Sequence, residues 1–407
     1  MRMWRECEQL QEELVKMRRE LHQIPEYGLN LPETQKYVVN ELEKLQIPYK
    51  CSETDSSIIA EIKGGKKGKT VALRADMDAL KIIEANEVDY RSKHEGLMHA
   101  CGHDAHITML LGAAKVLMAH KEEIKGNVRL LFQTGEELSK GAQVMIKDGA
   151  LEGVDAIFGQ HIGSIINKDI SAGKVIINPG CCMASFDRFV IKVNGTGCHG
   201  STPEKGIDPV NIASHIVIAL QEIIAREVSA TKAAVATIGM IHGGFAYNVI
   251  PGTVEIEGTI RALEEPVRQY VARRIREIAE NTAITFGGIA EIEIDWGAPP
   301  VINDDEMAKL VIRVAKEVVG EKDVVDNVPA PNMAGEDFAY YLEQIPGAFF
   351  FLSSSNPKKH TDIPHHKPSL RIQRKRPMPS PSGRRRSETT MSSSVACCNS
   401  FLALERW

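Results

Sequence analysis

Apolar residues recur every three or four positions in several stretches of the chain, which is the spacing of amphipathic helices. In residues 1–23 this pattern places Leu14, Met17 and Leu21 on one face. A helix starting at Pro32 fits the preference of proline for the first helical position. The same spacing predicts helices at 32–45, 106–120, 209–225, 265–286 and 307–319.

Shorter stretches are either continuously apolar or alternate between apolar and polar residues, as β-strands do. In residues 253–261, for example, Val254, Ile256 and Ile260 alternate with polar neighbours. These stretches predict strands at 58–62, 70–73, 128–133, 156–161, 186–193, 233–241, 253–261, 290–296 and 348–352.

Strands and helices alternate along most of the chain, so we expect an α/β fold. Its main domain, residues 1–182 and 298–368, has a central mixed sheet flanked by helices. Residues 183–297 have the order βαββαβ, which is the ferredoxin-like sandwich, and we expect an inserted lid or dimerisation domain there. Two domains also fit a length of 407 residues.

The composition is that of a globular protein, with 25% charged and 43% hydrophobic residues. Its apolar runs are too short to span a bilayer, and its charged N-terminus is unlike a secretory signal. Eight cysteines without a regular framework favour a reducing compartment. We therefore expect a cytoplasmic protein without a membrane partner.

The net charge of −5 conceals an uneven distribution. Residues 367–407 hold nine Lys or Arg and two Asp or Glu, so the rest of the chain is strongly acidic. Residues 369–407 are rich in Arg, Ser and Pro and lack helical spacing, which predicts a disordered tail or a frameshift close after His366. A nucleic-acid-binding arm is the alternative; it predicts salt-dependent DNA binding that is lost with the tail. We expect no nucleic-acid partner.

The run from His99 to His106, HACGHDAH, concentrates side chains that bind metals. A thiolate and imidazoles at this spacing suit zinc, manganese, cobalt or nickel. Gly102 permits a tight turn between Cys101 and His103, so both can face one point. The alternative is an ordinary helix N-terminus with Asp104 as its N-cap.

Other candidate residues follow predicted strands. Asp78 comes after the strand at 70–73, Glu136 and Glu137 after the strand at 128–133, and His161 ends the strand at 156–161. Such strand ends are where α/β sheets place their sites. Adjacent carboxylates suggest divided labour, one binding a metal and the other acting as a base, although they can also be surface charge.

Taken in order, these motifs resemble the amidohydrolase branch of the aminoacylase and carboxypeptidase-G type of dinuclear metallopeptidases. That branch includes hippurate hydrolases, N-acyl-amino-acid amidohydrolases and auxin-conjugate hydrolases. The match runs from the Arg19 to His22 region to Pro368. It implies a metal-dependent amidohydrolase that cleaves N-acyl amino acids, with two divalent ions (Mn²⁺, Zn²⁺, Co²⁺ or Ni²⁺) per subunit, in a homodimer or homotetramer.

The resemblance also implies a role for each metal ligand. Cys101 bridges the two ions, replacing an aspartate of related peptidases. His103 and Glu137 hold one ion with it, while His161 and His366 complete the other. Their spread from Cys101 to His366 argues against a structural zinc site, whose ligands are usually paired locally.

Further roles follow for residues that do not bind metal. Glu136 is the general base and later the acid that protonates the leaving amine. Asp78 orients the ligands from behind, as does Asp104. In the inserted domain the resemblance implies three further roles. His199 reaches the site of the partner subunit and stabilises the oxyanion there. Asn248 and Arg261 bind the carboxylate of the substrate.

Two rivals remain open. A dipeptidase or carboxypeptidase of the same family would use the same site. A chain impaired by its altered C-terminus would keep the fold without turnover. The turn before the paired glutamates also departs from the family, with Thr134-Gly135 where Pro-Ala is usual.

Overall fold

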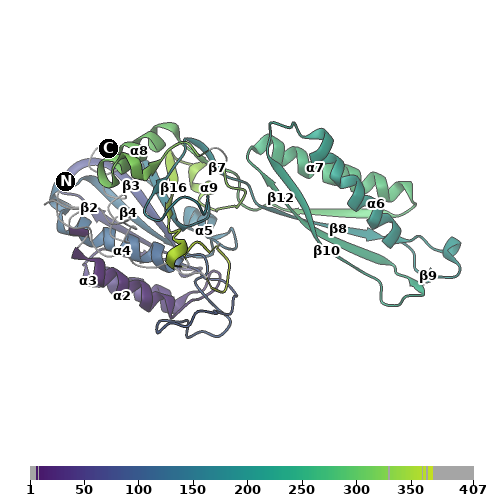
Figure 1. Ribbon diagram of the computed structural model, residues 1–407, viewed down its shortest axis with the longest axis horizontal. Coiled ribbons are helices and arrows are strands. Elements are labelled where there is room, and N and C mark those ends of the chain that lie inside the picture. The colour runs from purple at the N-terminus through teal and green to yellow at the C-terminus, as the bar shows by residue number, and fades with distance from the viewer. Residues whose placement is uncertain (1–5, 8, 329–330, 360, 364, 370–407) are drawn as a thin grey trace. The chain divides into compact units, whose positions relative to one another are not determined.

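The computed structural model describes residues 6–7, 9–328, 331–359, 361–363 and 365–369. The predicted α/β class is confirmed, and the chain divides into two compact units (Figure 1). Unit 1 comprises Met1–Cys182, Ile302–Asn332 and Asp337–Trp407, and unit 2 comprises Met183–Val301 and Met333–Glu336.

Unit 1 is built on an eight-stranded mixed sheet in the order β1-β2-β4-β3-β5-β16-β6-β15. Its centre is parallel, because β3 pairs in parallel with β4 and β5, and β16 pairs in parallel with β5. The strands are β1 (Tyr49–Cys51), β2 (Ile58–Lys63), β3 (Lys66–Asp76), β4 (Lys125–Gln133), β5 (Ala156–Gly163), β6 (Val175–Ile176), β15 (Val324–Val325) and β16 (Gly347–Ser353).

Residues 64–65 join β2 to β3, yet these strands are not neighbours in the sheet. Strand β4 lies between them, antiparallel to β2 and parallel to β3. Strand β4 therefore reaches the centre of the sheet, and its carboxyl end lies beside that of β3.

Helices cover the sheet through side chains that alternate along the strands. Leu73, Leu130 and Phe350 share one core with residues of α4 and α8, and α2 and α3 contact α4. Phe349 points to the opposite face, where its ring contacts Phe338 at 5.0 Å between centroids. The helices of unit 1 are α2 (Gln11–His22), α3 (Pro32–Lys44), α4 (His103–Ala119), α5 (Gly141–Lys147), α8 (Asp305–Val319) and α9 (Ala339–Leu342).

Unit 2 has a four-stranded antiparallel sheet in the order β10-β12-β8-β13. Helices α6 and α7 cover one face, where Ile191, Ile256 and Ile275 are fully buried (Figure 1). Its elements are β8 (Asp187–Asn194), β9 (Cys198–His199), α6 (Pro209–Glu222), β10 (Ala234–Gly243), β11 (Val249–Ile250), β12 (Thr253–Ala262), α7 (Glu265–Thr285) and β13 (Ile289–Asp295).

No helix in the described part of the chain is both long enough and apolar enough to cross a membrane. The basic tail predicted at 369–407 lies outside the described residues except for Ser369.

Candidate metal centre

The carboxyl ends of three parallel strands bring the candidate side chains of unit 1 to one edge of its sheet. Asp78 follows β3, the pair Glu136 and Glu137 follows β4, and His161 lies near the end of β5. Because β3 is parallel to both neighbours, the three strands end at the same edge.

A glycine turn delivers the thiol and a further imidazole to this edge. Gly102 has a φ of 98°, which favours glycine, and it occupies the N-cap of α4. Cys101 precedes this turn and His103 opens the helix, and both side chains are buried. The alternative with Asp104 as N-cap is wrong, because Asp104 lies inside the first turn.

The predicted metal-binding residues of unit 1 form overlapping groups of donors. In each group the donor atoms lie within 4.8 Å of one another. The groups are Cys101, His103 and His161; Cys101, Glu137 and His366; and His103, Glu136 and Glu137. Cys101 and His103 each belong to two of these groups, so the groups join into one cluster.

The structure adds His365, which sequence reasoning passed over in favour of its neighbour. His365 Nδ1 lies 3.5 Å from Cys101 Sγ, and His161 Nε2 lies 3.3 Å from the same sulfur. His366 Nε2 lies 3.5 Å from Glu137 Oε1, and its side chain is largely exposed. Both consecutive histidines therefore approach the cluster, and their adjacency was the signal available in the sequence.

The charge balance of this buried cluster suits a bound cation. Burial, Glu137 and Glu136 raise the pKa of the Cys101 thiol well above its usual value. Burial lowers the pKa of His161, which keeps this imidazole neutral. Burial also lowers the pKa of His103, but neighbouring carboxylates led by Asp76 outweigh burial and raise this pKa to about 10.

An unpartnered atom points to the same conclusion. His103 Nε2 is buried and has no hydrogen-bond partner among the described residues. A polar atom buried in this way costs free energy unless it binds something. Thiol, imidazole and carboxylate donors together are the set that zinc and its neighbours prefer, so these residues fit divalent metal ions.

Asp78 holds the backbone and the imidazole that carry metal-binding groups, without itself belonging to the donor groups named above. Its two carboxylate oxygens accept the backbone N–H groups of Glu136 and Glu137, each at 3.1 Å. Its Oδ1 also lies 3.4 Å from His103 Nδ1. Asp78 thus fixes the turn that carries both glutamates and lies beside a metal-binding imidazole.

The turn itself is shaped by the residues that depart from the family pattern. Gly135 has a φ of 61°, and a Cβ there would lie 2.5 Å from Leu29 Cδ2. The Thr134 hydroxyl donates to Asp55 Oδ2 at 2.5 Å, and the Thr134 N–H donates to Ser57 Oγ at 3.3 Å. These contacts hold the backbone directly before Glu136.

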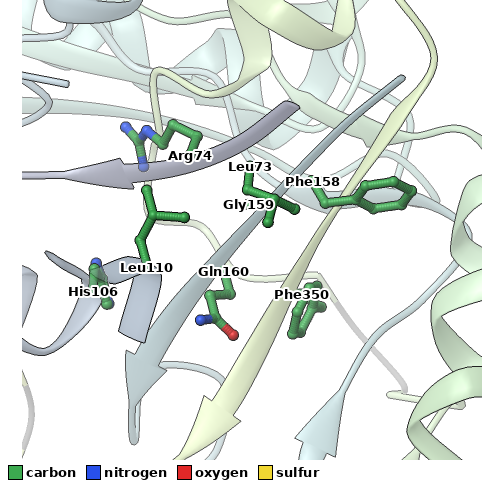
Figure 2. A pocket seen from close by; sticks show the side chains of 8 residues that line it. All are labelled: Leu73, Arg74, His106, Leu110, Phe158, Gly159, Gln160 and Phe350. Carbon is green, nitrogen blue, oxygen red and sulfur yellow. The ribbon is translucent and has the colours of Figure 1, made fainter. Parts of the chain in front are cut away.

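A second buried network lies beneath the cluster and was missed by sequence reasoning. His106 Nε2 accepts the N–H of Ile162, so its Nδ1 carries the proton and donates to Asp76 Oδ1 at 2.5 Å. Arg74 donates to the other oxygen of Asp76 at 2.6 Å. Figure 2 shows Arg74 and His106 around a small cavity beside Gln160. The signal in the sequence was the spacing of three residues from His103, which places His106 on the same helix face.

Asp104 is oriented towards α2. Its Oδ2 lies 2.7 Å from His22 Nδ1 and 2.9 Å from Arg18 Nε. Burial opposes ionisation of Asp104, but the charges of Arg18 and His22 outweigh it and hold the pKa of this carboxyl well below its usual value. Asp104 thereby anchors the first turn of α4, directly after His103.

The remaining candidates lie in unit 2. His199 is exposed on β9, where its Nδ1 accepts the N–H of Ser201 at 3.1 Å and lies 2.7 Å from the Ser201 hydroxyl oxygen. Asn248 is close to it, since its carbonyl accepts the N–H of Gly200 at 2.8 Å. Arg261 lies on β12, and burial lowers its pKa. Their roles stay predictions.

The chain matches the sequence model described as peptidase family M20/M25/M40 over residues 72–374. It is 41% identical over 364 residues to an N-acetyl-L-cysteine deacetylase of Bacillus subtilis, covering 89% of this chain and 84% of the relative. It is 37% identical to thermostable carboxypeptidase 2 of Saccharolobus solfataricus, covering 89% and 91%. It is also 37% identical to the IAA-amino acid hydrolase ILR1-like 5 of Arabidopsis thaliana, covering 88% and 82%.

Solved structures agree with these relatives. A putative aminohydrolase from methicillin-resistant Staphylococcus aureus superposes with a TM-score of 0.86 at 31% identity, covering 99% of this chain and 97% of the other. The Bacillus subtilis YXEP protein, described as a dinuclear metal-binding peptidase, superposes with a TM-score of 0.77 at 32% identity, covering 98% of each chain.

Proposed function

The chain belongs to peptidase family M20/M25/M40, whose members named above are hydrolases, and we propose that it cleaves the amide bond of N-acyl amino acids. The products are a carboxylic acid and a free amino acid. The observation that carries this proposal is the set of donors around Cys101, of which Cys101, His103 and His161 are buried, with the buried carboxylate of Glu136 beside them.

Two divalent ions are the proposed cofactors. The residues that would hold them are Cys101, His103, Glu137, His161 and one or both histidines of the pair His365 and His366. Such ions supply Lewis-acid chemistry, because they polarise a carbonyl and lower the pKa of water. Manganese, zinc, cobalt and nickel all suit this donor set.

Glu136 is the proposed general base. Its side chain is buried, and its Oε2 lies 3.9 Å from His103 Nε2. It takes a proton from the attacking water as the oxygen adds to the acyl carbon. It then gives this proton to the amine nitrogen as the C–N bond breaks, so one carboxylate serves both steps.

Residues of unit 2 are proposed to bind the substrate. Arg261 suits an amino-acid carboxylate because its planar guanidinium can pair with both oxygens, and Asn248 assists it. His199 from a second copy of the chain is proposed to stabilise the developing oxyanion.

A homo-oligomer, a dimer or a tetramer, is part of this proposal. Strand β10 is an edge strand of the sheet in unit 2, and Met240 and Ile241 on it are 45% and 52% exposed. Edge strands with apolar side chains readily pair with another chain. A change of Ile241→Asp should shift the mass measured by light scattering towards that of the monomer.

We also propose a cytoplasmic location, because eight cysteines without a regular framework favour a reducing compartment.

A second candidate function is carboxypeptidase activity. It is favoured by the 37% identity to a thermostable carboxypeptidase, and it uses the same site. An impaired enzyme, the consequence of an altered C-terminus, is the other alternative.

The test is a hydrolysis panel of N-acetyl, N-benzoyl and indole-acetyl amino acids and dipeptides, run with each of the four metals. We expect acyl amino acids to be cleaved faster than peptides. Glu136→Gln should lower kcat by about 10²–10⁴ with metal binding retained. The matched control is Glu152→Gln at an exposed position. Cleavage by Glu136→Gln at the rate of this control would contradict the role of Glu136, and hydrolysis of peptides alone would favour the second candidate.

A further inference from the structure

A buried carboxylate lies in the irregular segment that leads from β3 to the metal-binding turn. Glu84 is only 3% exposed, whereas the apolar side chain of its neighbour Ile83 is 71% exposed. A charged residue turned inward beside an apolar residue turned outward reverses the usual preference. Specific contacts must therefore hold Glu84 in place.

Those contacts use both oxygens of the carboxylate. Oε1 accepts from Asn86 Nδ2 at 2.9 Å and from His22 Nε2 at 3.1 Å. Oε2 accepts the N–H of Ser92 at 2.8 Å. Glu84 thus joins helix α2 to two points of the irregular segment.

The residue after Glu84 holds the end of the described chain. We call residues 365–369 the histidine arm, because it begins with His365 and His366. The Ala85 N–H donates to the carbonyl of Pro368 at 2.8 Å, and the His366 N–H donates to the carbonyl of Ala100 at 2.9 Å. Ala100 directly precedes Cys101, so each bond ties the arm to the segment that carries the metal-binding turn.

Glu84 is also connected to α4, through His22. His22 contacts Glu84 through Nε2, and it contacts Asp104 through Nδ1 at 2.7 Å. Asp104 follows the metal-binding His103 in the first turn of α4. A continuous set of contacts therefore links α4, α2, Glu84 and the arm, all within unit 1.

We propose that Glu84 is a positioning residue that couples the histidine arm to the metal centre through Ala85. The proposal rests on the proposed function, since it assumes that the arm's histidines bind metal. Among the described residues, His365 approaches Cys101, His366 approaches Glu137, and two backbone bonds, from Ala85 and to Ala100, hold the arm's main chain. The bond from Ala85 depends on the position of Ala85, which Glu84 fixes through its own contacts. Without Glu84 the arm opens locally while the donors on α4, β4 and β5 stay assembled.

The test compares three full-length variants: Glu84→Ala, which removes all side-chain bonds; Glu84→Gln, which keeps the amide oxygen as an acceptor for His22; and Glu87→Ala as the matched control. Glu87 lies three residues further along the same segment and is exposed. Cobalt titration of the metal-free proteins measures the number and affinity of bound ions. The thiolate-to-cobalt absorption band reports Cys101, and hydrogen exchange measures opening of the arm.

For Glu84→Ala we expect one ion to bind about 10–100-fold more weakly, as is typical when support for a ligand is lost. The thiolate-to-cobalt band persists, amides of the arm exchange faster, and Glu84→Gln restores part of the affinity. A merely structural role would instead weaken both ions and the absorption band together. That result, or metal binding and exchange equal to those of Glu87→Ala, would overturn the proposal.

A wild-type chain that binds no divalent ion would contradict the proposed function instead. Hydrogen exchange in the arm then still tests whether Glu84 holds the arm. Faster exchange in Glu84→Ala than in Glu87→Ala supports this coupling, and equal exchange refutes it.

Discussion

Replacing Arg74 by methionine should destabilise unit 1 more than almost any surface change, because Arg74 is the cation of a fully buried ionic network. Its guanidinium donates to Asp76 at 2.6 Å, to Asp337 at 2.9 Å and to Gln133 at 2.9 Å. The side chains of Arg74, Asp76 and Asp337 have no exposed surface. Methionine fills most of the volume but removes the guanidinium from both carboxylates. Asp76 then keeps the hydrogen bond from His106, and Asp337 keeps those from Gln133 and Ala142.

Breaking a buried ion pair by removing one partner costs about 3–5 kcal/mol, because the charge left behind is neither paired nor solvated. An exposed pair such as Lys309 with Glu306 at 2.7 Å contributes little, because water screens the two charges. We therefore expect Arg74→Met to lower the free energy of opening of unit 1 by about 3–5 kcal/mol, and Lys309→Met to leave it nearly unchanged.

Hydrogen exchange of the amides in β3 and β4, measured on the metal-free protein, is the suitable assay. It reports the opening of unit 1 itself and does not require both units to unfold together. Adding Asp337→Asn to Arg74→Met should recover part of the loss, since it removes one buried charge. A loss no larger than that of Lys309→Met would refute the reasoning.

Three further predictions concern the metal centre and its surroundings. In Gly163→Ala the new Cβ would lie 1.7 Å from His365 Nε2, so we expect this variant to retain less metal after dialysis. The control is Gly153→Ala, which is also at positive φ but has open space around it. Equal metal retention in the two variants would argue against a role for His365. Burial opposes ionisation of Glu84, but hydrogen bonds led by that from His22 lower its pKa to about 2. The stability that the ionised carboxylate contributes is therefore present above about pH 4.5 and is lost as the pH falls towards 2. The stability difference between wild type and Glu84→Gln should shrink over that range, and a difference independent of pH would contradict this. Adding divalent metal at about 100 times its Kd should raise the free energy of unfolding by about 2.7 kcal/mol, seen as a higher melting temperature than in chelator, and an unchanged melting temperature would exclude tight binding.

Much of the fold follows from local patterns in the sequence. The helix predicted at 32–45 matches α3, and the strand predicted at 128–133 lies within β4. The helix predicted at 106–120 begins earlier in the structure, at His103, because the turn at Gly102 already provides its N-cap. Periodicity locates such elements well since it reflects which side of each faces the core.

The candidate site was predictable where a strand delivers its residue. Asp78, Glu136 and His161 follow apolar strands, and parallel strands end at a common edge, so their proximity could be expected from the sequence. The role of Cys101 as a shared donor came from the resemblance to a family, and the donor groups of the structure are compatible with it.

Other features depend on contacts between residues distant in the chain, which no local pattern encodes. The position of β4 between β2 and β3, the bond from His106 to Asp76, and the approach of His365 to Cys101 are of this kind. The sequence by itself determined the elements and the chemical types of the donors, because these depend on neighbouring residues. The tertiary structure alone decided which donors meet and what supports them, because burial pairs each polar group with whatever partner the packed chain brings within reach.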